Sequence, residues 1–162
     1  MSELSDLLER FRRGPELLTM ATTGAAGSML DFKPENGLSM RQIVCHVADA
    51  EALGAVQLRH VLVEDNPPLI QVNLDNWARR LDYSGHKISY ALEAFRRLRA
   101  DNYELLEDLA DSAFAQTGVG PDGKPVTLSE IVEQMVLHLE KCVRDLQSAR
   151  AAYKEHRAQQ AG

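Results

Sequence analysis

Apolar residues recur at steps of three and four over long stretches of this 162-residue chain, which is the spacing of one face of an α-helix. Gly14-Pro15 interrupts the first stretch, where proline either kinks the helix or starts a new one. Helices that each bury one face predict an all-α fold, a four-helix bundle. The helices are expected over residues 3–22, 39–63, 86–109 and 127–156.

Two of these helices begin with a capping box, in which the first residue and the residue three positions on bond each other's backbone amides. Ser39 with Gln42 opens the second helix, and Thr127 with Glu130 opens the fourth. The run EDNPP at 64–68 ends the second helix, because proline cannot continue it. The helix boundaries are therefore expected close to these residues.

The connections between the helices differ in length. Residues 23–38 contain glycines and a proline and are expected to be irregular, and residues 111–126 form a loop with a tight turn, where a small hairpin is one alternative. Residues 69–85 predict a crossover strap with a short helical piece near 75–80. This connection is longer than those that join antiparallel neighbours, so it can return the chain along the bundle and make the second and third helices parallel.

Length and composition place the chain in a single domain, residues 1–162. A formal net charge of −6 argues against a phosphate-binding surface, so no nucleic-acid partner is expected. No apolar run approaches the roughly 20 residues of a membrane span, and residues 1–13 lack the apolar core of a signal peptide. We therefore expect a cytoplasmic protein without a membrane partner. Cys45 and Cys142 are expected to be reduced, with a disulfide between them as the alternative.

Three side chains that can bind metal lie on the stripes expected to be buried. His46 lies on the stripe of the second helix, and His138 and Cys142 lie four residues apart on that of the fourth, hence on one face. Imidazole and thiolate groups bind zinc, nickel, copper or iron, and three such ligands leave an open coordination position. Alternatively, the histidines are hydrogen-bonded core residues and Cys142 is a small hydrophobe. Cys45 follows about 100° around the helix from His46 and is not expected to bind the same metal.

Three segments together resemble the DinB/YfiT-like family of metalloenzymes: SMRQIVCHVADAE at 39–51, ALEAFRRLRADNYELLEDL at 91–109 and GVGPDGKPVTLSEIVEQMVLHLEKCVRDL at 118–146. The resemblance implies an up-down-down-up bundle, a homodimer and a divalent metal, zinc or nickel. It implies that His46 and His138 are metal ligands, and that Cys142 stands where the family usually has a histidine. It also implies a small-molecule substrate, in hydrolysis or in transfer of a low-molecular-weight thiol.

Two further candidates, Glu51 and Arg99, come from the same resemblance, and the others come from their positions on the helices. Glu51 matches an acidic position of the family, where it is either a general base or support for a ligand, or else part of a salt bridge. Arg99 matches a family arginine and is either solvated or buried against Glu51. Gln134 lies one turn before His138 and is a candidate neighbour of the site. The other histidines are expected at the surface: His60, His86 and His156.

A second hypothesis places the protein in a different functional class. With cysteine as the third ligand, the bundle could have lost its metal and serve as a non-catalytic binding or interaction module. That reading predicts that added zinc or nickel does not raise the melting temperature, because a ligand stabilises only a protein that it binds.

Overall fold

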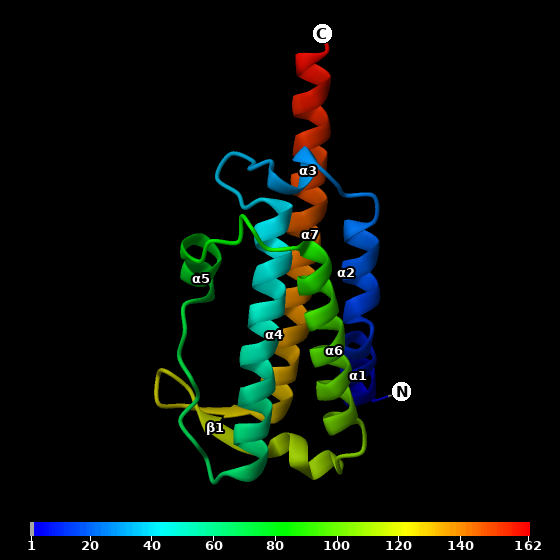
Figure 1. The fold of residues 1–162 in the computed structure, drawn as a ribbon. Helices are drawn as coiled ribbons and strands as arrows, with labels where there is room; N and C mark the ends of the chain where they lie inside the picture. The colour runs from blue at the N-terminus through cyan, green and yellow to red at the C-terminus, as the bar shows by residue number, and fades with distance from the viewer. Residues whose placement is uncertain (1) are drawn as a thin grey trace.

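The computed structural model describes residues 2–162 as a helical bundle (Figure 1). The chain runs up through α1 and α2, down through α4, down again through α6 and up through α7, so α4 and α6 are parallel neighbours. The predicted up-down-down-up topology is confirmed. The bundle helices are α1 (Glu3–Arg12), α2 (Gly14–Thr22), α4 (Met40–Val63), α6 (Ile88–Glu107) and α7 (Leu128–Gln160).

The connections contain short elements of their own: α3 (Ser28–Asp31), α5 (Leu74–Arg80), the 3-10 helix η1 (Asp111–Ala115), β1 (Thr117–Val119) and β2 (Pro125–Thr127). The strands pair antiparallel, with Gly118 opposite Val126, so the alternative of a small hairpin is confirmed. The amide of Leu69 donates to the carbonyl of Val119 over 2.9 Å, which fastens the start of the strap to the hairpin. From there the strap, residues 69–85, passes outside α4 and carries α5 (Figure 1).

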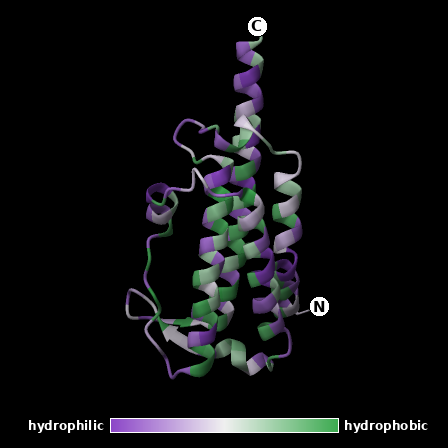
Figure 2. Ribbon diagram, viewed as in Figure 1, coloured by the Kyte–Doolittle hydropathy of each residue, from purple (hydrophilic) through white to green (hydrophobic). Residues whose placement is uncertain are grey.

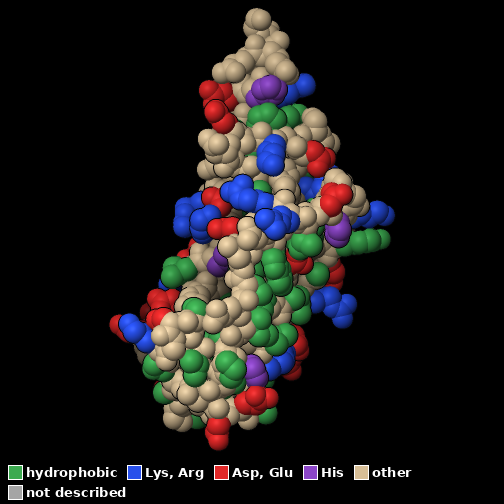
Figure 3. Space-filling view, turned by 90° about the vertical axis from the view of Figure 1, so that its left-hand side faces the viewer, with side chains coloured by type: hydrophobic (Ala, Val, Ile, Leu, Met, Phe, Trp, Pro, Cys, Tyr) green, Lys and Arg blue, Asp and Glu red, His purple; other side chains and the backbone are tan. Residues whose placement is uncertain are grey.

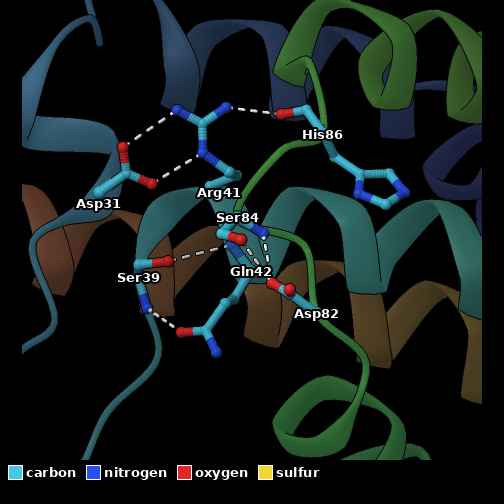
Figure 4. Close-up of polar contacts among 7 residues, drawn as sticks. All are labelled: Asp31, Ser39, Arg41, Gln42, Asp82, Ser84 and His86. Carbon is cyan, nitrogen blue, oxygen red and sulfur yellow. Dashed lines mark hydrogen bonds and ion pairs between the residues drawn. The ribbon is translucent and has the colours of Figure 1, made fainter.

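Both capping boxes form as predicted. The Ser39 hydroxyl accepts from the Gln42 amide over 3.1 Å, and the Gln42 side chain accepts from the Ser39 amide over 2.9 Å (Figure 4). Thr127 and Glu130 make the same exchange at the start of α7. α7 continues to Gln160, past its predicted end near His156, because the tail is built of good helix formers such as Ala, Arg and Gln.

Arg41, in the first turn of α4, joins two connections at the upper end of the bundle (Figure 4). Its guanidinium donates to both carboxylate oxygens of Asp31 in α3, over 2.7 and 3.1 Å. It also donates to the backbone carbonyl of His86, at the end of the strap, over 2.6 Å. The hydroxyl of Tyr83 in the strap donates to Asp49 of α4. These contacts fix the end of the strap against α4.

The interior contains two apolar clusters, and Figure 2 shows hydrophobic residues concentrated on the bundle helices while α5 and the projecting end of α7 are mostly hydrophilic. The upper core includes Leu18, Met40, Val44, Phe95 and Leu146. The lower core includes Phe11, Leu58, Leu106, Leu128 and Val132. Buried polar side chains of α4 and α6 complete the interior, and they are described with the site below.

The break between α1 and α2 arises locally at Pro15, and a tertiary contact compensates for it. Pro15 has no amide hydrogen, so the carbonyl of Phe11, four residues earlier, loses its helical donor. Arg99 of α6 supplies a donor instead, with its Nη1 2.9 Å from that carbonyl oxygen. A Cβ atom on Gly14 would lie 2.6 Å from both Arg99 Nη1 and Leu139 Cδ2, so only glycine permits this approach. The expected restart at Gly14-Pro15 is confirmed.

Within the described residues, every helix is too short or too polar to cross a membrane. Cys45 and Cys142 are both buried and free, so the alternative of a disulfide between them is wrong.

Candidate metal centre

The structure brings the three predicted ligands together between α4 and α7. His46 Nε2 lies 3.0 Å from His138 Nε2, and Cys142 Sγ lies 3.7 Å from the same nitrogen. The donor atoms of the three residues lie within 4.8 Å of one another. His46 is 5% exposed and Cys142 4%, while His138 is partly exposed. Cys45 stands outside this group, as its position on the helix predicts.

Two of the three separations between donor atoms are close to those around a tetrahedrally bound zinc-like ion. Zn–N bonds of about 2.05 Å and a Zn–S bond of about 2.3 Å correspond to separations of about 3.3 Å between two nitrogens and about 3.6 Å between nitrogen and sulfur. The 3.0 and 3.7 Å observed here are close to both values. Two imidazoles and a thiolate are also the ligand types that zinc and nickel accept.

Burial sets the protonation of the trio. It lowers the pKa of His138 to about 4, with smaller contributions from His46 and Lys141, and it lowers the pKa of His46 as well. Both imidazoles are therefore neutral near pH 7, the state in which they bind metal. Burial, with Asp145 next, raises the pKa of the Cys142 thiol to about 12. Cys142 thus carries a proton without a metal and has to lose it on binding one.

One detail departs from common metal sites. The Nδ1 atom of His46 is buried and has no hydrogen-bond partner among the described residues. Metal-binding histidines usually donate their second ring N–H to a carboxylate or carbonyl, which orients the ring and raises its basicity. Without this support, the orientation of His46 depends on packing in α4 and on its contact with His138.

A cavity of about 250 Å³ adjoins the donor trio at His138. It lies between α4, α6 and α7, and Leu74 of α5 contributes to its wall. Figure 3 shows the strap face of the molecule, where Lys and Arg side chains gather at the level of α5. The residues that line the cavity at His138 are Val47, Ala50, Glu51, Leu53, Gly54, Gln57, Leu74, Phe95, Arg99, Ile131, Gln134, Met135, His138 and Leu139.

Glu51 and Arg99 form a buried ion pair at this cavity. Arg99 Nε and Nη2 each donate to a Glu51 carboxylate oxygen over 2.8 Å, and the two side chains are 2% and 3% exposed. Asn102 Nδ2 donates to the same carboxylate over 2.9 Å. The Arg99 guanidinium lies 4.0 Å from the centroid of the Phe11 ring and 5.0 Å from that of Phe95. The alternative of a solvated Arg99 is therefore wrong, and the buried pair with Glu51 is what forms.

Sequence reasoning missed two members of this network. Asn102 lies three residues after Arg99, so it faces the same side of α6, and a polar residue at that spacing was the available signal. Arg59 of α4 donates to Asn102 Oδ1 and to Asp101, each over 2.8 Å. The polar contacts thus run from the cavity wall to the surface.

The remaining candidates lie away from the trio. Gln134 is exposed and lines the cavity. His86 and His156 are exposed, as predicted, and the His156 ring packs on Phe32 with centroids 4.9 Å apart. His60 also lies at the surface, although it is only partly exposed, and its Nε2 contacts the exposed Glu64 at 2.9 Å.

The fold and the site define a helical bundle with an intramolecular His/His/Cys donor trio. The sequence profile of the DinB superfamily matches residues 10–141, which include His46 and His138 and end one residue before Cys142. The chain belongs to the DinB superfamily.

Two relatives with known descriptions have low sequence identity to this chain. The chain is 26% identical over 104 residues to a protein of Halalkalibacterium halodurans described as a "putative metal-dependent hydrolase", covering 64% of this chain and 60% of that one. It is 24% identical over 131 residues to an Oceanobacillus iheyensis protein of the same description, covering 80% and 72%. The match therefore spans less than two thirds of the first relative.

A solved structure, YfiT from Bacillus subtilis, superposes with a TM-score of 0.85 over 95% of this chain and 90% of its own. Its title describes a "probable metal-dependent hydrolase with an unusual four-helix bundle topology". At 21% identity this likeness shows the fold, and the topology agrees with the arrangement seen here.

Proposed function

We propose that this protein is a metal-dependent enzyme that hydrolyses a small molecule, with His46, His138 and Cys142 as the ligands of a divalent ion. The observation that carries the proposal is the convergence of three nitrogen and sulfur donors, 3.0 and 3.7 Å apart, beside a cavity of about 250 Å³. The descriptions of the two relatives support the hydrolytic class. Thiol transfer, which the sequence resemblance also implies, would use the same trio.

The three donor residues and the cavity wall have different roles in this proposal. His46 and His138 are neutral and present nitrogen lone pairs, and Cys142 supplies a thiolate once its proton leaves. A divalent ion bound by these three residues would supply Lewis-acid catalysis for hydrolysis of an ester or amide. The mostly apolar cavity wall holds the substrate beside His138. Because the donor set contains sulfur, zinc or nickel suits it better than a harder ion.

The geometry assigns Glu51 a positioning role in this proposal. Its oxygens accept three hydrogen bonds, two from Arg99 and one from Asn102. Both carboxylate oxygens are thus already engaged by side chains of α6. Glu51 therefore holds Arg99 and the cavity wall in place, and Gln134, at the cavity surface, is the better placed group to bond a substrate from the solvent side.

Two observations favour a second candidate, a metal-free binding module. His46 Nδ1 lacks an acceptor within the described part of the chain, and the Cys142 thiol has a raised pKa. Both weaken metal affinity relative to a site with three supported histidines. In this candidate the cavity binds its ligand without chemistry.

The test is elemental analysis of untagged protein purified without chelators, beside His46→Ala and Cys142→Ala variants. The enzyme proposal expects about one metal ion per chain, lost in both variants. Cys45→Ala is the matched control, since Cys45 is a buried cysteine outside the trio, and it should keep its metal. Cys142→His, which supplies the histidine usual in the family, should bind at least as tightly. Wild-type protein that neither contains metal nor takes up zinc or nickel on titration would establish the binding module instead.

A further inference from the structure

The cavity beside His138 has a lining that is apolar except at a few places. Among its described lining residues, the charged side chains are Glu51 and Arg99, and Gln57 and Gln134 are neutral and polar. We propose that this cavity selects the uncharged, mainly apolar part of the substrate, a group of about ten heavy atoms with a neutral hydrogen-bonding group such as an amide. The inference deepens the proposed function, and it rests on that function for the statement that the bound molecule is a substrate.

The size of the bound group follows from the volume. An apolar protein cavity of about 150 Å³ holds one benzene molecule. The cavity here, at about 250 Å³, is larger by more than half. It therefore accepts a six-membered ring with a few further heavy atoms, or an aliphatic group of similar volume.

The selection against charge follows from the ion pair. A free buried arginine would bind a ligand carboxylate with its two-pronged fork. Here Arg99 Nε and Nη2 already donate to Glu51, and Nη1 donates to the carbonyl of Phe11 over 2.9 Å. All three nitrogens are engaged, and the paired charges cancel. In the metal-free protein, a charged group that enters this cavity loses part of its hydration and meets no unpaired counter-charge, which is unfavourable.

The neutral polar side chains can satisfy an amide or a hydroxyl. The Gln57 carbonyl accepts from the backbone amide of Ile70 in the strap over 3.1 Å, which leaves its NH2 group as a donor. Gln134 offers both a donor and an acceptor. Leu53, Leu74 and Met135 supply apolar wall around them. A ligand with an apolar body and one neutral polar group matches this distribution.

The experiment titrates three probes of one shape into the protein as purified, and again after chelation, and follows binding by protein NMR. The probes are benzamide, benzoate and benzylamine, which share a ring and differ in charge. We expect benzamide to bind both forms, and to bind the chelated form at least about tenfold more tightly than either charged probe.

Variants identify the place of binding. Leu53→Trp fills the cavity and should abolish benzamide binding, whereas Val56→Trp, on the same helix but 51% exposed and outside the lining, should not. Gly54→Ala is a milder second variant, because its Cβ would lie 2.4 Å from Met135 Cε and push that side chain toward the cavity, so it should weaken binding without filling the space. Circular dichroism verifies that each variant is folded.

Several results overturn the inference: no binding of benzamide, equal or tighter binding of a charged probe to the chelated protein, or benzamide binding that Leu53→Trp leaves unchanged. Loss of benzamide binding on chelation alone also overturns it, because recognition would then depend on the metal. Cavity-dependent benzamide binding in a protein that takes up no metal supports the inference while the enzyme proposal fails, so the two failures are distinguishable.

Discussion

Removing one partner of the Glu51–Arg99 pair should cost far more stability than removing both. In Glu51→Leu the guanidinium of Arg99, whose side chain is 2% exposed, keeps its charge but loses the two bonds of 2.8 Å to the carboxylate. An unpaired buried charge of this kind costs about 3–5 kcal/mol. Arg99→Met leaves the Glu51 carboxylate with Asn102 as its remaining donor and should cost a similar amount.

The double variant Glu51→Leu/Arg99→Met removes both charges. Replacing a buried ion pair with apolar side chains is often nearly neutral, so the remaining loss comes from two unbonded groups, the carbonyl of Phe11 and the amide of Asn102, each about 1–3 kcal/mol. Each of these losses also occurs in one of the single variants, so neither adds to the coupling energy. The two single variants together predict a loss of about 6–10 kcal/mol, so the coupling energy should exceed about 3 kcal/mol. That excess is a substantial share of the 5–15 kcal/mol by which most domains are stable.

Urea unfolding followed by circular dichroism at equilibrium measures all three free energies of unfolding. Additive losses, within about 0.5 kcal/mol, would refute the reasoning, because the two side chains would then act independently. The matched control is Glu93–Arg96 on the same helix, a pair with a bond of 2.6 Å but about half exposed. Its coupling energy should stay below about 1 kcal/mol.

Three further predictions follow from single contacts. Because burial lowers the pKa of His138 from 6.5 to about 4, the unfolded chain binds more protons than the folded one between these values. His138 should therefore make chelated protein lose up to about 3 kcal/mol of stability as pH falls from 6.5 to 4, and His138→Leu should remove this share while leaving that of His46, whose pKa is also lowered by burial. Gly14→Ala should cost about 1–3 kcal/mol in urea unfolding, since its Cβ would lie 2.6 Å from Arg99 Nη1, whereas an unchanged midpoint would mean that α2 shifts freely. Thr127→Ala removes the hydroxyl that accepts from the Glu130 amide over 3.1 Å and should lower stability by about 1 kcal/mol, while Thr127→Ser should restore it.

The helices and their starts could be predicted because they depend on neighbours along the chain. A capping box joins residues three apart, as in Ser39 with Gln42, so no tertiary information is required. The place of His138 and Cys142 on one face follows in the same way, and their donor atoms indeed lie 3.7 Å apart. The length of the strap was also sufficient to predict that α4 and α6 run parallel.

Contacts between segments that are far apart in the chain could not be predicted from local sequence patterns. Arg99 sits in a charged cluster with Arg96 and Arg97, and nothing in that cluster shows which arginine is buried. Arg99 finds its buried partners in two distant segments, the Glu51 carboxylate of α4 and the carbonyl of Phe11 in α1. The cavity beside His138 and its wall from the strap likewise arise only when three helices and α5 are packed together.

The sequence by itself therefore determined the all-α class, the capped starts of α4 and α7 and the three metal-ligand candidates, because periodicity and capping are local. Only the tertiary structure decided that His46 and His138 meet at 3.0 Å, since the approach of α4 to α7 depends on side-chain volumes at positions far apart in the chain. It also decided that Glu51 is engaged with Arg99, and that the buried Nδ1 of His46 finds no acceptor within residues 2–162. These outcomes depend on how the helices pack. Packing is the result of many weak contacts between distant residues, which no short segment of the sequence shows.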